Sequence, residues 1–114
     1  MIIKALLDYL GEQLGVYVGL EAPEQTFGYV LIDQTGSSTS NRITTTTIAI
    51  QSYGQSLYGA YELNERVKAA MNGFVEISEV ASVRLETDYN FTNTATKQYR
   101  WQAVYQITHY LGGN

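Results

Sequence analysis

The stretch that decides the fold is Ile43-Thr44-Thr45-Thr46-Thr47-Ile48-Ala49-Ile50-Gln51. Its threonines and isoleucines branch at Cβ, which disfavours a helix and predicts a strand. The hydrophobic period then changes and predicts a helix, for which Gly54 and Ser56 offer a start and Asn72-Gly73 a left-handed stop. The apolar residues at helical spacing are Leu57, Ala60, Leu63, Val67, Ala70 and Met71.

A polar segment separates this strand from an earlier one. Tyr29-Val30-Leu31-Ile32 is a compact apolar run that predicts a buried strand. The segment between the two strands offers no core side chains and consists of Thr35, Gly36, Ser37, Ser38, Thr39, Ser40, Asn41 and Arg42. Two strands around a polar connection predict a hairpin. We interpret residues 35–42 as a flexible hairpin loop that orders when it docks on another protein, which makes it the candidate assembly interface.

The two ends of the chain complete the element order. Helical spacing predicts a helix over residues 2–14, ended by Gly15 and followed by a short strand at residues 16–18. Alternating residues predict two long antiparallel strands, at residues 82–89 and 98–107, joined by a polar loop at residues 90–96. The order α-β-β-β-α-β-β predicts a single α+β domain over residues 1–114. In it, two helices pack on a mostly antiparallel sheet of four to five strands.

The composition is that of a globular chain and limits its partners. Of 114 residues, 45% are hydrophobic and 16% are charged. A formal net charge of −4 lacks the basic footprint that nucleic-acid binding requires, so we expect no sequence-specific nucleic-acid binding. The absence of cysteine excludes disulfides and thiolate metal sites and fits synthesis in a reducing cytoplasm. No apolar stretch approaches the roughly 20 residues of a membrane span, so we expect no membrane partner.

The residues show no pattern typical of catalysis or of cofactor binding. His109 is the sole histidine, which excludes a His-His metal pair, and its place near the end of the last strand predicts a structural role. The carboxylates that lie nearest one another match exposed strand and loop positions, and they are Glu76, Glu79, Glu86 and Asp88. We therefore expect a protein that is not an enzyme and that uses neither a cofactor nor a metal.

Aromatic residues are the most informative excess in the composition. The chain has ten tyrosines, a residue type that is enriched at protein interfaces but that also packs sheets. Trp101, the single tryptophan, is expected in the core, where its truncation to alanine would cost roughly 3–5 kcal/mol.

Two stretches resemble proteins of a known family. Ala49-Ile50-Gln51-Ser52-Tyr53-Gly54-Gln55-Ser56-Leu57-Tyr58, continued by Glu62-Leu63-Asn64-Glu65-Arg66-Val67, resembles the strand-into-helix segment of small prophage tail proteins. Their closing hairpin is similar to Asp88-Tyr89-Asn90-Phe91-Thr92 with Lys97-Gln98-Tyr99-Arg100-Trp101-Gln102-Ala103 and Ile107-Thr108-His109-Tyr110. The family is the tail terminator, or tail-completion, group of long-tailed bacteriophages, and the likeness covers nearly the whole chain.

The resemblance implies a structural virion protein that is made in the cytoplasm of a bacterial host. It would form a ring, a hexamer, that caps the head-proximal end of the tail tube, ends tube polymerisation and joins the tube to the neck. Its partners would be further copies of itself, the major tail tube protein and a neck or head-completion protein. In such proteins the connection between the second and third strands reaches toward neighbouring subunits or the tube, and here it is residues 35–42.

Two other functions stay open for the sequence. One is a head–tail connector of the neck, which is a structural role in the same part of the virion. The other is a small-ligand-binding α+β domain with its pocket between the sheet and the helices.

Overall fold

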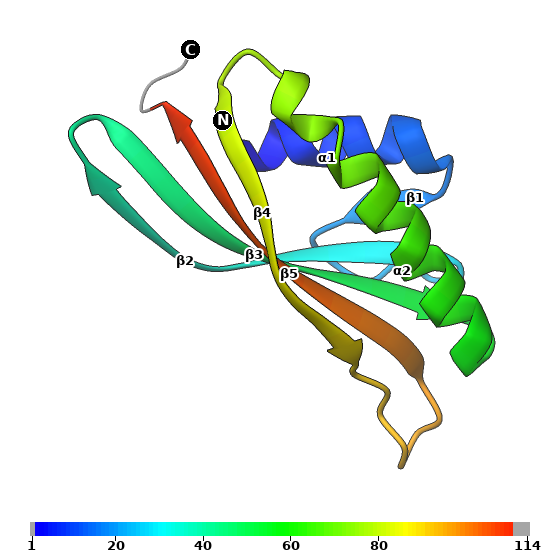
Figure 1. Ribbon diagram of the computed structural model, residues 1–114. Helices are drawn as coiled ribbons and strands as arrows, with labels where there is room; N and C mark the ends of the chain where they lie inside the picture. The colour runs from blue at the N-terminus through cyan, green and yellow to red at the C-terminus, as the bar shows by residue number, and fades with distance from the viewer. Residues whose placement is uncertain (1, 111–114) are drawn as a thin grey trace.

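The structure, a computed structural model, describes residues 2–110 and has the predicted order of elements (Figure 1). A short 3₁₀ helix, which the sequence did not predict, precedes the last two strands. The elements are α1 (Ile2–Leu14), β1 (Tyr17–Gly19), β2 (Tyr29–Ser40), β3 (Ile43–Gly54), α2 (Leu57–Met71), η1 (Phe74–Glu76), β4 (Val80–Asn90) and β5 (Tyr99–Tyr110). The predicted α+β fold with two helices and a mostly antiparallel sheet is confirmed.

The sheet has five strands in the order β1-β2-β3-β5-β4. β1 pairs with β2 in parallel, and every other neighbouring pair is antiparallel. Ile50 of β3 lies between Ile32 of β2 and Ala103 of β5, so the centre of the sheet is apolar. β2 and β4 are the long strands nearest the two edges.

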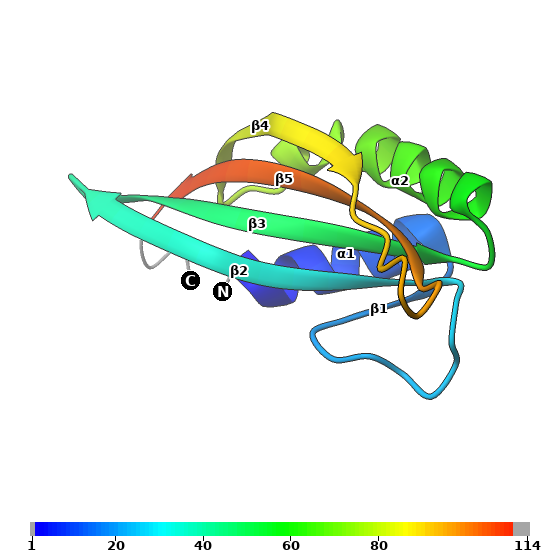
Figure 2. The same ribbon diagram turned by 90° about the horizontal axis from the view of Figure 1, so that it is seen from below.

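Both helices pack on one face of the sheet, and the described part of the chain places no helix on the other (Figures 1 and 2). The core lies between them, where one stripe of each helix meets alternate residues of the central strands. Its largest fully buried members are Phe74, Leu6, Leu10, Ile32, Ile48, Ile50, Met71 and Ile107. The opposite face has no helix within the described residues, but Tyr29, Tyr53 and Gln102 on it are buried.

The helix ends follow local chemistry at two of the three predicted points. Gly15 adopts a φ of +68°, the left-handed stop expected after α1. Ser56 caps α2 by accepting a hydrogen bond from the Gly59 N–H at 3.0 Å. The predicted left-handed stop at Asn72-Gly73 is wrong, because Asn72 has a φ of −60° and its N–H bonds to the Ala70 carbonyl. The helix instead tightens into η1, as a helix end can do when the next turn is packed.

Two β-bulges in β4 change which side chains face the helices. Register shifts occur between Val80 and Ser82 and between Leu85 and Thr87. A bulge inserts one extra residue, so the side chains after it point to the opposite faces. The prediction that side chains alternate regularly between the two faces over residues 82–89 is therefore wrong. Asp88 pairs with Ala103, whose side chain is on the face that the helices cover.

Candidate assembly surface

The segment predicted as a flexible loop is part of a long β-hairpin. Thr35–Ser40 continue β2, and only Asn41 and Arg42 form the turn before β3. The register pairs Gly36 with Thr47 and Ser40 with Ile43. The loop interpretation is wrong because the four threonines of β3 supply a partner strand with high β propensity, and the polar residues opposite complete its hydrogen-bond ladder.

We call residues 36–47 the arm, since Figures 1 and 2 show the end of the β2–β3 hairpin extending away from both helices. Hydroxyl contacts brace it across its strands, with Thr39 Oγ1 2.9 Å from Thr44 Oγ1. Thr46 Oγ1 lies 2.8 Å from His109 Nε2 on β5, which ties the arm to the next strand. His109 therefore has a structural contact, as predicted. A braced arm binds a partner without the ordering cost of a flexible loop.

Arg42 is the single charged residue between Asp33 and the end of β3. It is exposed, and it makes no hydrogen bond or ion pair with any residue in the described range 2–110. Asn41 and Arg42 have φ values of 53° and 65°, as the two central residues of a type I′ hairpin turn require. The arm thus ends in one positive side chain that is free to contact another molecule.

Along one edge, the arm leaves its backbone unpaired within the described residues. β1 pairs only with Tyr29, Val30 and Leu31, so the outer edge of β2 beyond them has no strand beside it. A bulge between Gln34 and Gly36 twists this edge near its middle. Bulges discourage unwanted pairing between edges, which leaves the turn and the side chains as the contact elements of the arm.

A second exposed surface lies at the start of α2. We call Leu57, Tyr58, Tyr61 and Glu62 the α2 patch. Tyr58 is 69% exposed, Leu57 is 42% exposed and Tyr61 is 41% exposed, so the prediction that Leu57 faces the core is wrong. The rings of Tyr58 and Tyr61 lie 6.4 Å apart. Exposed tyrosines on a rigid helix are the kind of anchor that protein interfaces use.

Trp101 supports the α2 patch instead of filling the core. Its ring meets that of Tyr61 edge-on, with centroids 5.4 Å apart. The side chain is half-buried, which corrects the expectation of a core tryptophan. This position follows from the register, because β5 aligns Trp101 with Ser52, close to the end of β3 where the sheet meets the first turn of α2.

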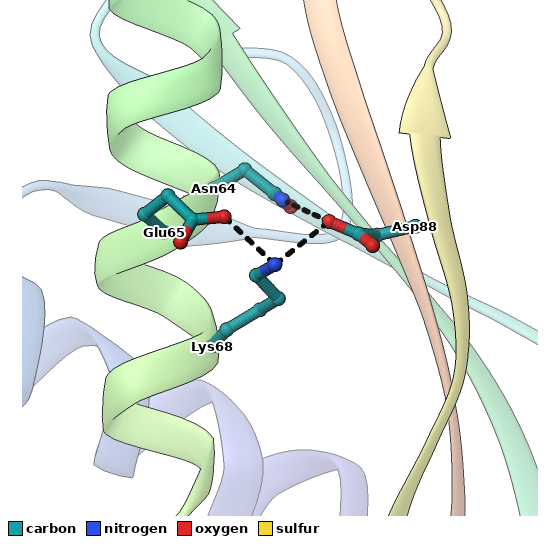
Figure 3. Close-up of polar contacts among 4 residues, drawn as sticks. All are labelled: Asn64, Glu65, Lys68 and Asp88. Atoms are coloured by element: carbon teal, nitrogen blue, oxygen red, sulfur yellow. Dashed lines mark hydrogen bonds and ion pairs between the residues drawn. The ribbon is translucent and has the colours of Figure 1, made fainter.

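A polar cluster joins α2 to β4 (Figure 3). Lys68 forms ion pairs with Glu65 at 2.7 Å and with Asp88 at 3.0 Å. Asn64, which is fully buried, donates a hydrogen bond from Nδ2 to the same Asp88 oxygen at 2.9 Å. The hydrogen bonds from Lys68 to Glu65 and Asp88 raise the pKa of the Lys68 ammonium. The cluster corrects the prediction that Asp88 lies on a solvated face, and the bulge before Asp88 explains the difference.

A cavity of about 390 Å³ lies beside this cluster, between α2, β4 and β5. Lys68, Leu85 and Tyr105 are among the residues that line it. Burial raises the pKa of the Tyr105 hydroxyl to about 12, so this hydroxyl stays protonated near neutral pH. The Lys68 ammonium is held by two carboxylates and is not an available base. Neither the Lys68 ammonium nor the Tyr105 hydroxyl is therefore an available general base in this geometry.

The uncovered face of the sheet carries a connected polar network. Tyr53 donates its hydroxyl proton to Gln51 Oε1 at 2.9 Å, and Gln51 Nε2 donates to Gln102 Oε1 at 2.8 Å. Gln102 in turn donates to the Tyr89 hydroxyl. The Arg100 guanidinium closes the row by donating to the Tyr53 hydroxyl at 3.3 Å. These groups satisfy one another, so the face is pre-organised and polar.

The described residues contain no group of three or more histidines, cysteines or acids placed to hold a metal ion. Within the same range, no helix is long and apolar enough to cross a membrane. Exposed side chains that form no hydrogen bond or ion pair with a described residue include Arg42 of the arm and Tyr58 and Glu62 of the α2 patch. Of these two surfaces, only the arm contains residues that the sequence predicted as a candidate assembly interface. Tyr58, Tyr61 and Glu62 carried a signal in their spacing of three and four, which places them on one helix side.

Two comparisons of the sequence with known proteins found no match. No protein-family model matches the chain, and no curated protein matches it. The arm and the α2 patch are therefore the features from which a role is inferred.

Proposed function

We propose that the chain is a structural protein of a bacteriophage tail, a terminator that acts as a ring. Six copies would cap the head-proximal end of the tail tube, end its polymerisation and join it to the neck. The partners in this proposal are other copies of the chain, the major tail tube protein and a neck protein. The chain would be made in the bacterial cytoplasm and would end up in the virion.

The arm is the observation that carries the proposal. It connects the second and third strands of the order α-β-β-β-α-β-β, which is the connection that reaches toward neighbours in the tail terminators that the chain resembles. Every β2 residue from Gly36 to Ser40 is exposed, whereas Thr44 and Thr46 of the facing strand are buried, so the β2 side of the arm lies outside the core of the domain. A segment that adds few side chains to the core but is held by strand pairing is suited to contact between molecules.

The chemistry of the arm supports assembly more than catalysis. Serine and threonine hydroxyls both donate and accept hydrogen bonds, so they adapt to a polar partner surface. Each contact of this kind is weak alone. A closed ring makes the same contact at every subunit boundary, so the free energy accumulates when the last subunit joins.

The proposal is tested by mixing the purified chain with polymerising tail-tube protein from the genome that encodes it. Negative-stain microscopy should show tubes of limited length that end in a ring. Tubes that continue to grow without a cap at any ratio of chain to tube protein would contradict the proposal. Preferential binding to a portal–adaptor assembly would favour the head–tail connector instead.

A further inference from the structure

The residue at the tip of the arm is an unusual choice for its backbone. Arg42 occupies the second central position of the turn with a φ of 65°, a region where glycine is favoured and other residues are disfavoured. A two-residue turn of this type is most often Asn-Gly or Asp-Gly, whereas here it is Asn41-Arg42. Backbone strain of this kind clusters at functional sites. Within the described residues, the Arg42 side chain contacts nothing that would supply one.

The α2 patch offers the groups that a guanidinium seeks. Glu62 is exposed and forms no ion pair or hydrogen bond with any described residue, whereas Glu65 on the next turn is held by Lys68. Tyr58 lies one helical turn before Glu62, so their side chains share one side of α2. A carboxylate beside tyrosine rings can bind an arginine both by charge and by cation–π contact.

These two complementary surfaces cannot meet within one copy. The domain is elongated, with principal extents of 44 × 24 × 23 Å. Figures 1 and 2 both show the turn of the β2–β3 hairpin at one end and the beginning of α2 at the other. Two different patches at opposite ends of one chain join copies head to tail, and such a contact closes into a ring when the rotation between copies permits.

We infer that the arm of one copy docks on the α2 patch of a second copy, with the Arg42 guanidinium against the Glu62 carboxylate and the rings of Tyr58 and Tyr61. The charges favour this occupant, because the chain has a net charge of −4 and the tip of the arm is its isolated positive end. The ring that results rests on the proposed tail function, but the contact between copies does not require the tube.

Disulfide trapping tests the contact directly, because the chain has no cysteine of its own. One preparation carries Arg42→Cys and a mass-tagged preparation carries Glu62→Cys, and the two are mixed under mild oxidation. The mixed disulfide should form at least about tenfold faster than with a Lys97→Cys preparation in place of Arg42→Cys. Lys97 is a matched control because it is also an exposed cation with positive φ, at 56°, in the other long hairpin. Equal rates for the two preparations would overturn the inference.

Charge exchange supplies a second readout that does not depend on oxidation. Arg42→Glu and Glu62→Arg should each weaken self-association in sedimentation velocity by about tenfold or more, and the double variant should recover most of the loss. Glu21→Arg is the control for the acidic side, since Glu21 is exposed and lies outside α2. Failure of the double variant to recover, with melting temperatures unchanged, would refute the pairing.

The two hypotheses fail in different ways. If the mixed disulfide forms at the expected rate but tubes are not capped, the contact between copies stands and the tail function is wrong. If the Arg42→Glu and Glu62→Arg variants cap tubes as well as the unaltered chain does, the tail function stands and this contact is wrong.

Discussion

Replacing Arg42 with glycine should make the protein more stable and less able to assemble. Arg42 has a φ of 65°, and holding a non-glycine residue in the left-handed region costs about 1–2 kcal/mol. Glycine removes that cost, but it also raises the conformational entropy of the unfolded chain, which lowers the free energy of unfolding by about 0.4–1 kcal/mol. The net expectation is a gain of roughly 0.5–1 kcal/mol in the free energy of unfolding. For a domain of this size that gain raises Tm by about 2–5 °C.

The assay is urea denaturation at low protein concentration, where association between copies does not add to the apparent stability. Asn41→Gly is the control within the turn, because asparagine tolerates its φ of 53° better and should gain less. Lys97→Gly, at a position with a φ of 56°, should raise the free energy of unfolding by a similar amount without any effect on self-association. If Arg42→Gly lowers stability, or leaves both stability and self-association unchanged, then the strain argument for Arg42 is refuted.

Three further predictions concern the body of the domain. Asp88→Ala should lower the free energy of unfolding, measured by urea denaturation, by about 1–3 kcal/mol. The substitution leaves the buried Asn64 amide and the Lys68 ammonium without the carboxylate that accepts their hydrogen bonds. An unchanged free energy of unfolding would mean that water replaces the carboxylate. Burial lowers the pKa of His109 in the folded protein below its ordinary value of 6.5. The neutral imidazole therefore contributes its full share of the free energy of unfolding above about pH 6.5, and this share is lost as the pH falls through the pKa of the folded state. His109→Gln should therefore flatten the fall of Tm on acidification, and an equal fall in both proteins would contradict that cause. Trp101→Ala should cost about 1–3 kcal/mol, less than a fully buried tryptophan, and a larger loss in thermal or urea denaturation would show that Trp101 belongs to the core.

The order of elements was predictable because hydrophobic period depends on local sequence alone. Leu6, Leu10 and Leu14 mark α1 at steps of four, and the threonine-rich run marks β3. The positions of side chains on β4 were not predictable, because a single extra residue near Glu86 reverses the faces that follow it. The sequence around that bulge carries no glycine or proline that would announce it.

The composition of the sequence predicted where the candidate interface lies, but it did not predict the conformation of that segment. The hairpin turn lacks the glycine that usually reveals such turns, so residues 35–42 had the composition of a loop. What makes them a strand is the facing partner, Ile43 to Thr47, and pairing between strands is a non-local property. The α2 patch was missed for a related reason. Leu57 fits the apolar period of α2, but it is the first residue of the helix and is 42% exposed.

Labelling the ends of preformed tail tubes shows whether the chain binds as a ring at one end of a tube. The chain would carry a gold-binding tag at its N-terminus and would be added to finished tubes, which are then viewed by electron microscopy. A ring-forming terminator predicts one cluster of gold at one end of each tube and arrest of further growth at that end. Gold scattered along the tube walls, or no gold at either end while the tagged chain remains folded, would contradict the account.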